Sequence, residues 1–238
     1  MAVIALMMTI SASAQFYIYC SDGNVIKVDS ISMIAPSENV DSHNGHEYVD
    51  LGLSVKWATC NVGATKPEEY GDYFAWGETQ PKSTYDWSTY KYCNGSHTTL
   101  TKYCTTSSYG TVDNKTTLDL SDDAARANWG GSWRMPTDAE LTELREQCTW
   151  IWTTQNGVYG YKVTSKKSGY TNKSIFLPAA GRRSGSSLDL AGRQGDYLSS
   201  SLGTDYPSSA YELYFDSGSV GSYGNGRSGG SSVRPVCL

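Results

Sequence analysis

Short alternating runs of hydrophobic and polar residues divide the chain into predicted strands, two helices and long polar loops. After an apolar run at the N-terminus, two β-prone runs flank an Asp-Gly turn and predict a β-hairpin arm over residues 15–36. Residues 37–46 (SENVDSHNGH) are polar and rich in turn-forming residues, which indicates a linker. Apolar and polar residues alternate from there on, so we expect the main domain to occupy residues 47–238.

Capping residues predict the two helices. The first is short, because it opens at the polar run 121–123 and stops at Gly130. The second begins after Thr137, whose spacing to Glu140 is that of a capping box, and its apolar stripe starts at Leu141. We expect this stripe to pack on a sheet.

Four later runs predict strands, at residues 158–165, 174–180, 212–215 and 231–236. Each run is rich in β-branched or aromatic side chains or alternates between apolar and polar positions. Residues 79–119, by contrast, are polar and rich in Tyr and Thr, which indicates a long excursion over the surface.

The composition is that of a folded, acidic protein. The 18 Tyr and 7 Trp supply enough ring area to offset the entropy lost when the backbone becomes ordered. The net charge of −5 provides no positive field that would hold a polyanion, so nucleic acid is not an expected partner.

Residues 1–14 are interpreted as a signal peptide, because their apolar run has secretory length and ends in small residues before Gln15. A buried N-terminal strand or helix is the alternative. The signal peptide predicts an exported protein, at the cell surface or extracellular. The run is too short to span a bilayer, so we do not expect a membrane-spanning protein.

Six cysteines in an exported chain favour disulfide bonds. We expect Cys93 to pair with Cys104, because the two residues would close a short loop. Cys60 in a predicted strand and Cys148 at the end of a predicted helix are the second candidate pair.

No metal or cofactor site is predicted. Cys-x-x-Cys spacing and Cys/His clusters, which would indicate structural zinc, do not occur. His43 and His46 lie beside Asp41 in the predicted linker, where nothing apolar would hold metal ligands in place. The sequence leaves open a structural calcium ion held by aspartate and backbone oxygens.

Residues 181–233 differ in composition from the rest of the chain. About half of them are Gly or Ser, and none is Lys, Trp, Met, His or Cys. We expect a poor core and a tolerant ligand-binding face, because Tyr offers broad amphipathic contacts while Ser, Gly and Asn offer adaptable hydrogen bonds. Tyr214 could equally point inward on a strand. The candidate contact residues are the Tyr, Asp, Asn and Arg side chains expected to be exposed in this stretch: Arg182, Asp189, Arg193, Asp196, Asp205, Tyr206, Tyr211, Tyr214, Asp216, Tyr223, Asn225 and Arg227.

Two catalytic patterns near the C-terminus are set aside. Residues 226–230 match Gly-x-Ser-x-Gly, but a predicted strand rather than a helix follows, and no His comes after Ser228. Residues 224–229 match Gly-x-Gly-x-x-Gly, but no βα unit is predicted there to bind a dinucleotide. Catalysis is therefore not predicted.

Several longer motifs occur in one order along the chain: YVDLGLSVKWATCNVGA, YGDYFAWGET, DDAARANWGGSWRMPTDAELTEL, FLPAAG, YLSSS and SVRPV. Together they resemble the "major paralogous domain" proteins of Bacteroidetes and Fibrobacter, whose C-type-lectin-like fold is related to the formylglycine-generating enzyme family. The resemblance covers residues 47–237. It implies an α+β domain in which two helices pack on antiparallel sheets and a C-terminal sheet carries the ligand face.

Members of this fold also serve as variable proteins of diversity-generating retroelements, whose mutated codons yield Asn, Asp, Ser, Gly, Tyr and Arg but not Lys, Trp, Met, Gln or Glu. Residues 181–230 are similar in composition to this set of amino acids, except at Gln194 and Glu212. The resemblance implies a secreted or surface-displayed receptor or adhesin that binds a protein or glycan at the cell surface. A fimbrial or surface-layer module without diversification is the alternative. An oxidase-like enzyme comes third, because only Cys237 lies where that chemistry needs two cysteines.

Overall fold

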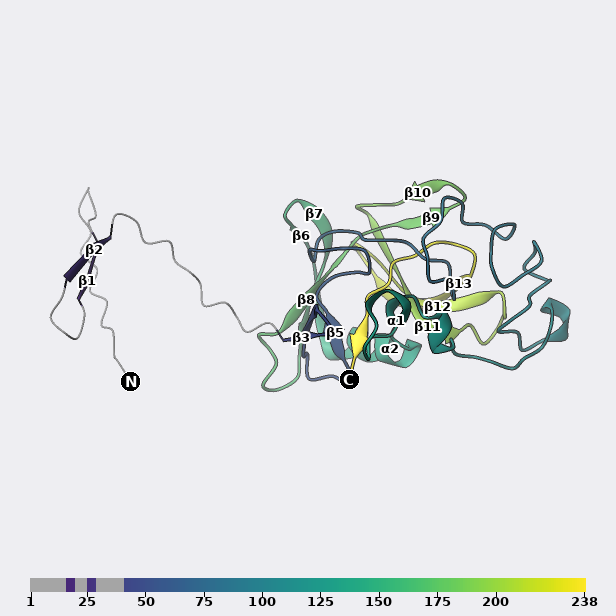
Figure 1. The fold of residues 1–238 in the computed structure, drawn as a ribbon, viewed down its shortest axis with the longest axis horizontal. Coiled ribbons are helices and arrows are strands. Elements are labelled where there is room, and N and C mark those ends of the chain that lie inside the picture. The colour runs from purple at the N-terminus through teal and green to yellow at the C-terminus, as the bar shows by residue number, and fades with distance from the viewer. Residues whose placement is uncertain (1–15, 20–24, 29–40) are drawn as a thin grey trace. The chain divides into compact units, whose positions relative to one another are not determined.

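The computed structural model describes residues 16–19, 25–28 and 41–238, in two compact units that divide after Asn39. In the first unit β1 (Phe16–Tyr19) and β2 (Val25–Val28) pair antiparallel, in the arrangement of the predicted hairpin arm (Figure 1). The predicted signal peptide, the Asp-Gly turn, Cys20 and the first four residues of the predicted linker lie outside the described residues.

The second unit is a mixed α+β domain of mostly antiparallel strands and two α-helices, which confirms the expected fold class at that level. Its first sheet runs in the order β14-β5-β4-β3, so the end of the chain pairs with a strand near the start of the domain. These strands are β3 (Ser42–His43), β4 (His46–Val49), β5 (Lys56–Ala58) and β14 (Val236–Cys237).

The second sheet is a meander of β6 (Cys148–Gln155), β7 (Val158–Ser165) and β8 (Ser174–Pro178). Asn156 and Gly157 connect β6 to β7 with φ values of 48° and 83°. This two-residue turn with positive φ at both positions matches the right-handed twist of the strands that it joins. The predicted strands 158–165 and 174–180 are therefore present, the second ending two residues early.

The third sheet is formed by the Gly/Ser-rich stretch itself. It consists of β11 (Gln194–Leu202), β12 (Ser209–Asp216) and β13 (Val220–Gly226), all antiparallel. A separate hairpin of β9 (Arg182–Ser184) and β10 (Ser187–Asp189) precedes it. The predicted strand 212–215 is confirmed within β12, whereas the predicted strand 231–236 is reduced to isolated bridges and β14.

Both helices begin at the caps that the sequence predicts. Asp123 caps α1 (Ala124–Trp129) by accepting a hydrogen bond from the Arg126 amide, and Thr137 and Glu140 form the full capping box of α2 (Asp138–Gln147). Figure 1 shows the second and third sheets on opposite sides of the domain, and α2 contacts strands of both. Two short 3₁₀ turns complete the elements, at Ser107–Tyr109 and Leu120–Asp122.

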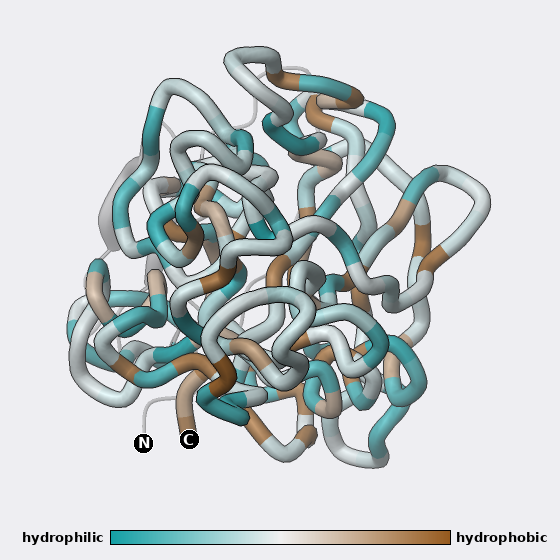
Figure 2. Tube along the Cα trace, turned by 90° about the vertical axis from the view of Figure 1, so that its right-hand side faces the viewer, coloured by the Kyte–Doolittle hydropathy of each residue, from teal (hydrophilic) through white to brown (hydrophobic). Residues whose placement is uncertain are grey.

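The core is divided into two clusters. One contains the fully buried Trp76 and Trp133, and the other contains Trp57 with the α2 residues Leu141 and Leu144. In the domain of residues 41–238 the hydrophobic segments are short and separated by polar ones along the trace, so no long apolar element forms its centre (Figure 2). Each short segment instead contributes one or two side chains to the core.

The loop 79–119 is not the surface excursion that its polarity predicts. Four of its tyrosines, Tyr85, Tyr90, Tyr92 and Tyr103, are buried. The hydroxyl groups of Tyr85, Tyr90 and Tyr103 donate hydrogen bonds inside the protein. Tyr90, for example, donates to the Trp76 carbonyl at 2.7 Å. Aromatic rings at irregular spacing therefore build part of the core without any strand or helix.

The second half of the predicted linker also belongs to the domain. His46 stacks on Trp129 with ring centroids 3.8 Å apart, and burial lowers its pKa. The Ser132 amide donates to His43 Nε2 at 2.8 Å, and the Trp133 indole donates to the His43 carbonyl at 2.8 Å. The linker prediction is therefore wrong for residues 42–46, because two indole rings bind the polar segment.

The predicted disulfide bonds are absent: Cys60, Cys93, Cys104 and Cys148 are all free thiols. The Cys93 thiol donates to the Trp87 carbonyl at 3.1 Å, and the Cys104 thiol donates to the Thr106 carbonyl at 3.2 Å. The Cys104 segment is held by a carboxylate instead of a disulfide. That carboxylate, Asp113, accepts from the backbone amides of Tyr103, Cys104 and Lys115 at 2.8, 2.9 and 3.2 Å.

Replacing Cys93 by Ser should therefore change the free energy of unfolding by less than about 1 kcal/mol, because a hydroxyl can donate to the same carbonyl. Loss of a disulfide would cost about 2–5 kcal/mol. Urea unfolding of the wild type and Cys93→Ser, with and without dithiothreitol, measures the difference. A large loss that dithiothreitol reproduces in the wild type would contradict the free-thiol assignment.

Candidate ligand-binding site

One face of the third sheet packs in the core, whereas the other is polar around Asp196 and Tyr214 but also carries the buried Leu198 opposite Glu212. Leu213 and Phe215 of β12 point into the core, where Tyr197 stacks on Phe215 at a centroid distance of 5.7 Å. Alternation along the strand places Glu212 and Tyr214 on the other face. The expectation that the stretch makes a poor core is therefore wrong for one face of its sheet.

The polar face is hollowed. The hollow has a volume of about 450 Å³, which is within the range of small-ligand pockets. It brings together five of the twelve predicted contact residues, from three different strands and the β9–β10 hairpin. Its lining consists of Arg182, Asp196, Glu212, Tyr214, Ser219, Tyr223, Gly224 and Asn225.

Two buried carboxyl groups form the floor. Asp196 lies opposite Tyr214 and Glu212 opposite Leu198, so the two acids are diagonal neighbours on one face, and their carboxyl groups are hydrogen-bonded to each other. Neutral hydrogen-bond donors surround both carboxyl groups. Both Asp196 oxygens accept from the Gln194 amide at 2.9 and 2.8 Å, whereas Glu212 accepts from Asn225 at 2.7 Å and from Ser231 at 3.2 Å.

Burial gives this pair unusual proton affinity. Burial and, second, the charge of Asp196 raise the pKa of Glu212 to about 8, and burial raises the pKa of Asp196 as well. Arg182 opposes both shifts through its charge. Two carboxyl groups in contact cannot both ionise cheaply away from water, so the pair retains a proton near pH 7.

Two tyrosines and an arginine form the rim. The rings of Tyr214 and Tyr223 meet edge to face with centroids 5.4 Å apart, and Tyr223 is 56% exposed. The Tyr214 hydroxyl donates to Asp216 at 2.9 Å, and Asp216 also closes the β12–β13 turn by accepting from the Ser219 amide. Arg182 is half-buried and forms no ion pair with any described residue.

The other predicted contact residues do not line the hollow. Five are exposed or half-buried elsewhere on the stretch: Asp189, Arg193, Asp205, Tyr206 and Tyr211.

Two residues expected to be exposed are buried, Asp196 in the floor (0% exposed) and Arg227 (1% exposed). Arg227 does not line the hollow. Its guanidinium donates to the Tyr90 hydroxyl at 2.9 Å and to the carbonyls of Tyr103 and Pro207 at 2.9 and 2.8 Å. It also lies over the Trp76 ring, 4.9 Å from the centroid. The arginine fastens β13 to the tyrosine-rich loop and does not face solvent.

The prediction missed Glu212, Ser219 and Gly224. A signal was present for the first, because Glu212 is the one glutamate among residues 181–233 and falls in an apolar run. No sequence pattern distinguishes Ser219 or Gly224 from the many other Ser and Gly residues of the stretch.

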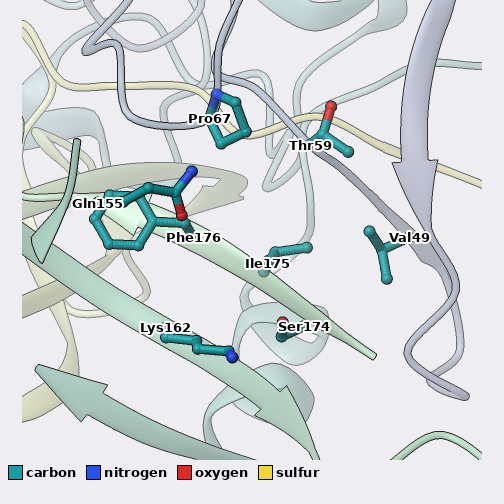
Figure 3. A pocket seen from close by; sticks show the side chains of 8 residues that line it. All are labelled: Val49, Thr59, Pro67, Gln155, Lys162, Ser174, Ile175 and Phe176. Atoms are coloured by element: carbon teal, nitrogen blue, oxygen red, sulfur yellow. The ribbon is translucent and has the colours of Figure 1, made fainter. Parts of the chain in front are cut away.

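A second hollow, of about 250 Å³, lies over β8 (Figure 3). Ile175 and Phe176 form its apolar side, and Lys162 is the one charged residue in its lining. It contains none of the predicted contact residues and no buried charge. We therefore regard the hollow on the third sheet as the candidate site.

Within the part of the chain that the structure describes, no three His, Cys, Asp or Glu side chains are grouped so as to hold a metal ion. Neither described helix is long and apolar enough to cross a membrane. Comparison of the chain with models of known protein families, with curated proteins and with solved structures found no match.

The burial of Arg227 predicts that Arg227→Ala destabilises the domain by about 3 kcal/mol or more, because several carbonyls lose their donor inside the protein. Arg193→Ala is the matched control, since Arg193 is exposed and its loss should cost less than about 0.5 kcal/mol. Chemical denaturation compares the two. Equal stability of both variants would return Arg227 to the list of contact residues.

The carboxyl pair predicts an unusual pH dependence of stability. The folded state binds more protons than the unfolded chain between the ordinary Glu pKa of 4.5 and about 8. The wild type should therefore lose stability, on the order of a few kcal/mol, as pH rises through this window, and the loss should level off above it.

Glu212→Gln should remove most of this slope, because the amide stays neutral at every pH. Asp189→Asn, at an exposed position, serves as the control and should keep the wild-type slope. Urea unfolding of the three proteins from pH 5 to pH 9 provides the comparison. Parallel curves for the wild type and Glu212→Gln would show that the pair is fully ionised in the folded protein.

Proposed function

We propose that the protein is an exported ligand-binding protein, and not an enzyme, that recognises a protein or glycan at the cell surface through the polar face of the third sheet. One observation carries this proposal. Residues chosen from composition alone, Arg182, Asp196, Tyr214, Tyr223 and Asn225, come together in one hollow although they are spread over more than forty positions. Converging polar and aromatic groups in a concave surface are the usual form of a binding site.

The architecture supports a scaffold that displays this face. The opposite side of the sheet is fixed in the core by Leu213 and Phe215, and α2 contacts all three strands. A binding surface built on packed strands loses little conformational entropy when a ligand arrives. The mixed α+β arrangement and the motif order together favour a C-type-lectin-like domain of the major-paralogous type.

Burial divides the stretch into positions that tolerate variation and positions that do not. Asp189, Arg193, Asp205, Tyr206 and Tyr223 are exposed, so other side chains fit there without loss of packing. A diversified or paralogue-variable receptor needs such positions beside a fixed framework. We propose that variation, where it occurs among related chains, is concentrated at these exposed positions.

Tyr223→Ala should abolish capture of the ligand while the melting temperature stays within about 5 °C, because the ring is exposed and rims the hollow. Tyr159→Ala is the control. Tyr159 is 51% exposed but lies on β7, outside the third sheet, so its loss should not change binding.

Arrays of glycans and of surface proteins, probed with the wild type and both variants, make the comparison. Ligands retained equally by Tyr223→Ala and the wild type would place the binding surface elsewhere. Loss of binding in Tyr159→Ala alone would move it to the second sheet.

A further inference from the structure

Resting on the proposed function, we infer that the hollow is a subsite for a neutral, hydroxyl-rich ligand, a carbohydrate, which Asn225 and Arg182 bind by direct hydrogen bonds above the buried acid pair. The lining above the floor offers both kinds of hydrogen-bonding group. The Arg182 guanidinium donates, and the Asn225 amide and the Tyr223 hydroxyl can each donate and accept. Each sugar hydroxyl can donate one hydrogen bond to an acceptor and accept another from a donor.

The charge of the hollow fits an uncharged ligand. Burial raises the pKa of Asp196 and brings that of Glu212 to about 8, so Glu212 is mostly protonated near pH 7 and the positive charge of Arg182 offsets negative charge on Asp196. The other titratable groups that face the pair are the Tyr214 and Tyr223 hydroxyls, with Asp216 behind Tyr214. A hydrogen bond to Asp216 raises the pKa of Tyr214, so this hydroxyl stays neutral. An anionic ligand would therefore be repelled by the carboxylate, and a cationic ligand would be repelled by Arg182.

The aromatic rim adds an apolar surface. Tyr223 is exposed and is held edge to face against Tyr214, so its position is fixed on one side while the other side is open. Sugar rings have apolar C–H faces as well as hydroxyl edges, and tyrosine offers an apolar body with a polar tip. The ring can cover a sugar while Arg182 and Asn225 bind its hydroxyl groups.

The acid pair is not arranged around a cation. All four of its carboxyl oxygens already accept hydrogen bonds, those of Asp196 from Gln194 and those of Glu212 from Asn225 and Ser231. A metal ion at the floor would have to displace these donors. Binding of the carbohydrate should therefore continue in EDTA.

The test uses the full chain and methyl glycosides of neutral hexoses and of N-acetylhexosamines as probes, with N-acetylneuraminic acid and spermidine as the charged probes. Saturation-transfer NMR detects contact, and calorimetry measures the dissociation constant. Neutral glycosides should bind, and Tyr223→Ala and Arg182→Ala should each weaken binding at least tenfold. Tyr159→Ala, at an exposed residue of β7 outside the third sheet, should leave the dissociation constant within about twofold.

Protonation of the acid pair predicts a pH dependence of ligand binding that a purely structural role of Glu212 would not produce. If the sugar requires the protonated pair, binding by the wild type should weaken about tenfold between pH 7 and pH 9, because pH 9 lies about one unit above the pKa of Glu212. Glu212→Gln should bind with similar affinity at both pH values, since an amide can donate to Asp196 and accept from Asn225. A cationic ligand would show the opposite trend and bind more tightly as the pH rises.

Three results would overturn the inference: tighter binding of spermidine than of any glycoside, sugar binding that EDTA abolishes, or a surface protein captured through the hollow while no glycoside binds. The last result would leave the proposed function intact. If no ligand of any class on the arrays responded to Tyr223→Ala or Arg182→Ala, the proposed function itself would fail. Melting curves of each variant separate loss of binding from loss of folding.

Discussion

Two buried arginines connect the C-terminal stretch to the rest of the domain. Arg227 binds carbonyls of the tyrosine-rich loop, and Arg234 donates to Asn61 at 2.9 Å, to the Ala58 carbonyl at 3.0 Å and to the Phe176 carbonyl at 2.9 Å. A guanidinium group is costly to bury unless its donors are all used. Loop carbonyls accept from Arg227, whereas Ala58 at the end of β5 and Phe176 in β8 accept from Arg234. The arginines therefore fix the C-terminal end of a Gly/Ser-rich segment that has few apolar side chains of its own.

With its C-terminal end fixed, the stretch can use its alternation to separate two roles. One face of β12 contributes Leu213 and Phe215 to the core, and the next residues along the strand, Glu212 and Tyr214, form the hollow. The same strand therefore carries both stability and recognition. The carboxyl pair persists at the floor because it is protonated and hydrogen-bonded, which lowers the cost of burying two acids.

Local chemistry was predictable from sequence, and long-range chemistry was not. The Thr137–Glu140 capping box and the hairpin strand 158–165 depend on neighbours in the chain, and both are present. The docking of His46 on Trp129 and the burial of Arg227 against Tyr90 depend on residues about eighty and more than a hundred and thirty positions away. The same limit explains the cysteines, since short spacing does not tell where two thiols point.

The candidate site shows the same difference between what local sequence predicts and what long-range contacts decide. Composition identified the stretch and five residues of the hollow, but it treated every polar side chain in the stretch as exposed. Strand register decides which of them meet: Asp196 reaches Glu212 across β11 and β12, whereas Asp189 and Arg193 lie outside. A binding face that varies in sequence can therefore change its rim at Tyr223 without altering the floor, because the floor residues also satisfy one another's hydrogen bonds. Replacement of a floor acid would leave a buried partner unpaired, and this constraint limits how far such a face can diversify.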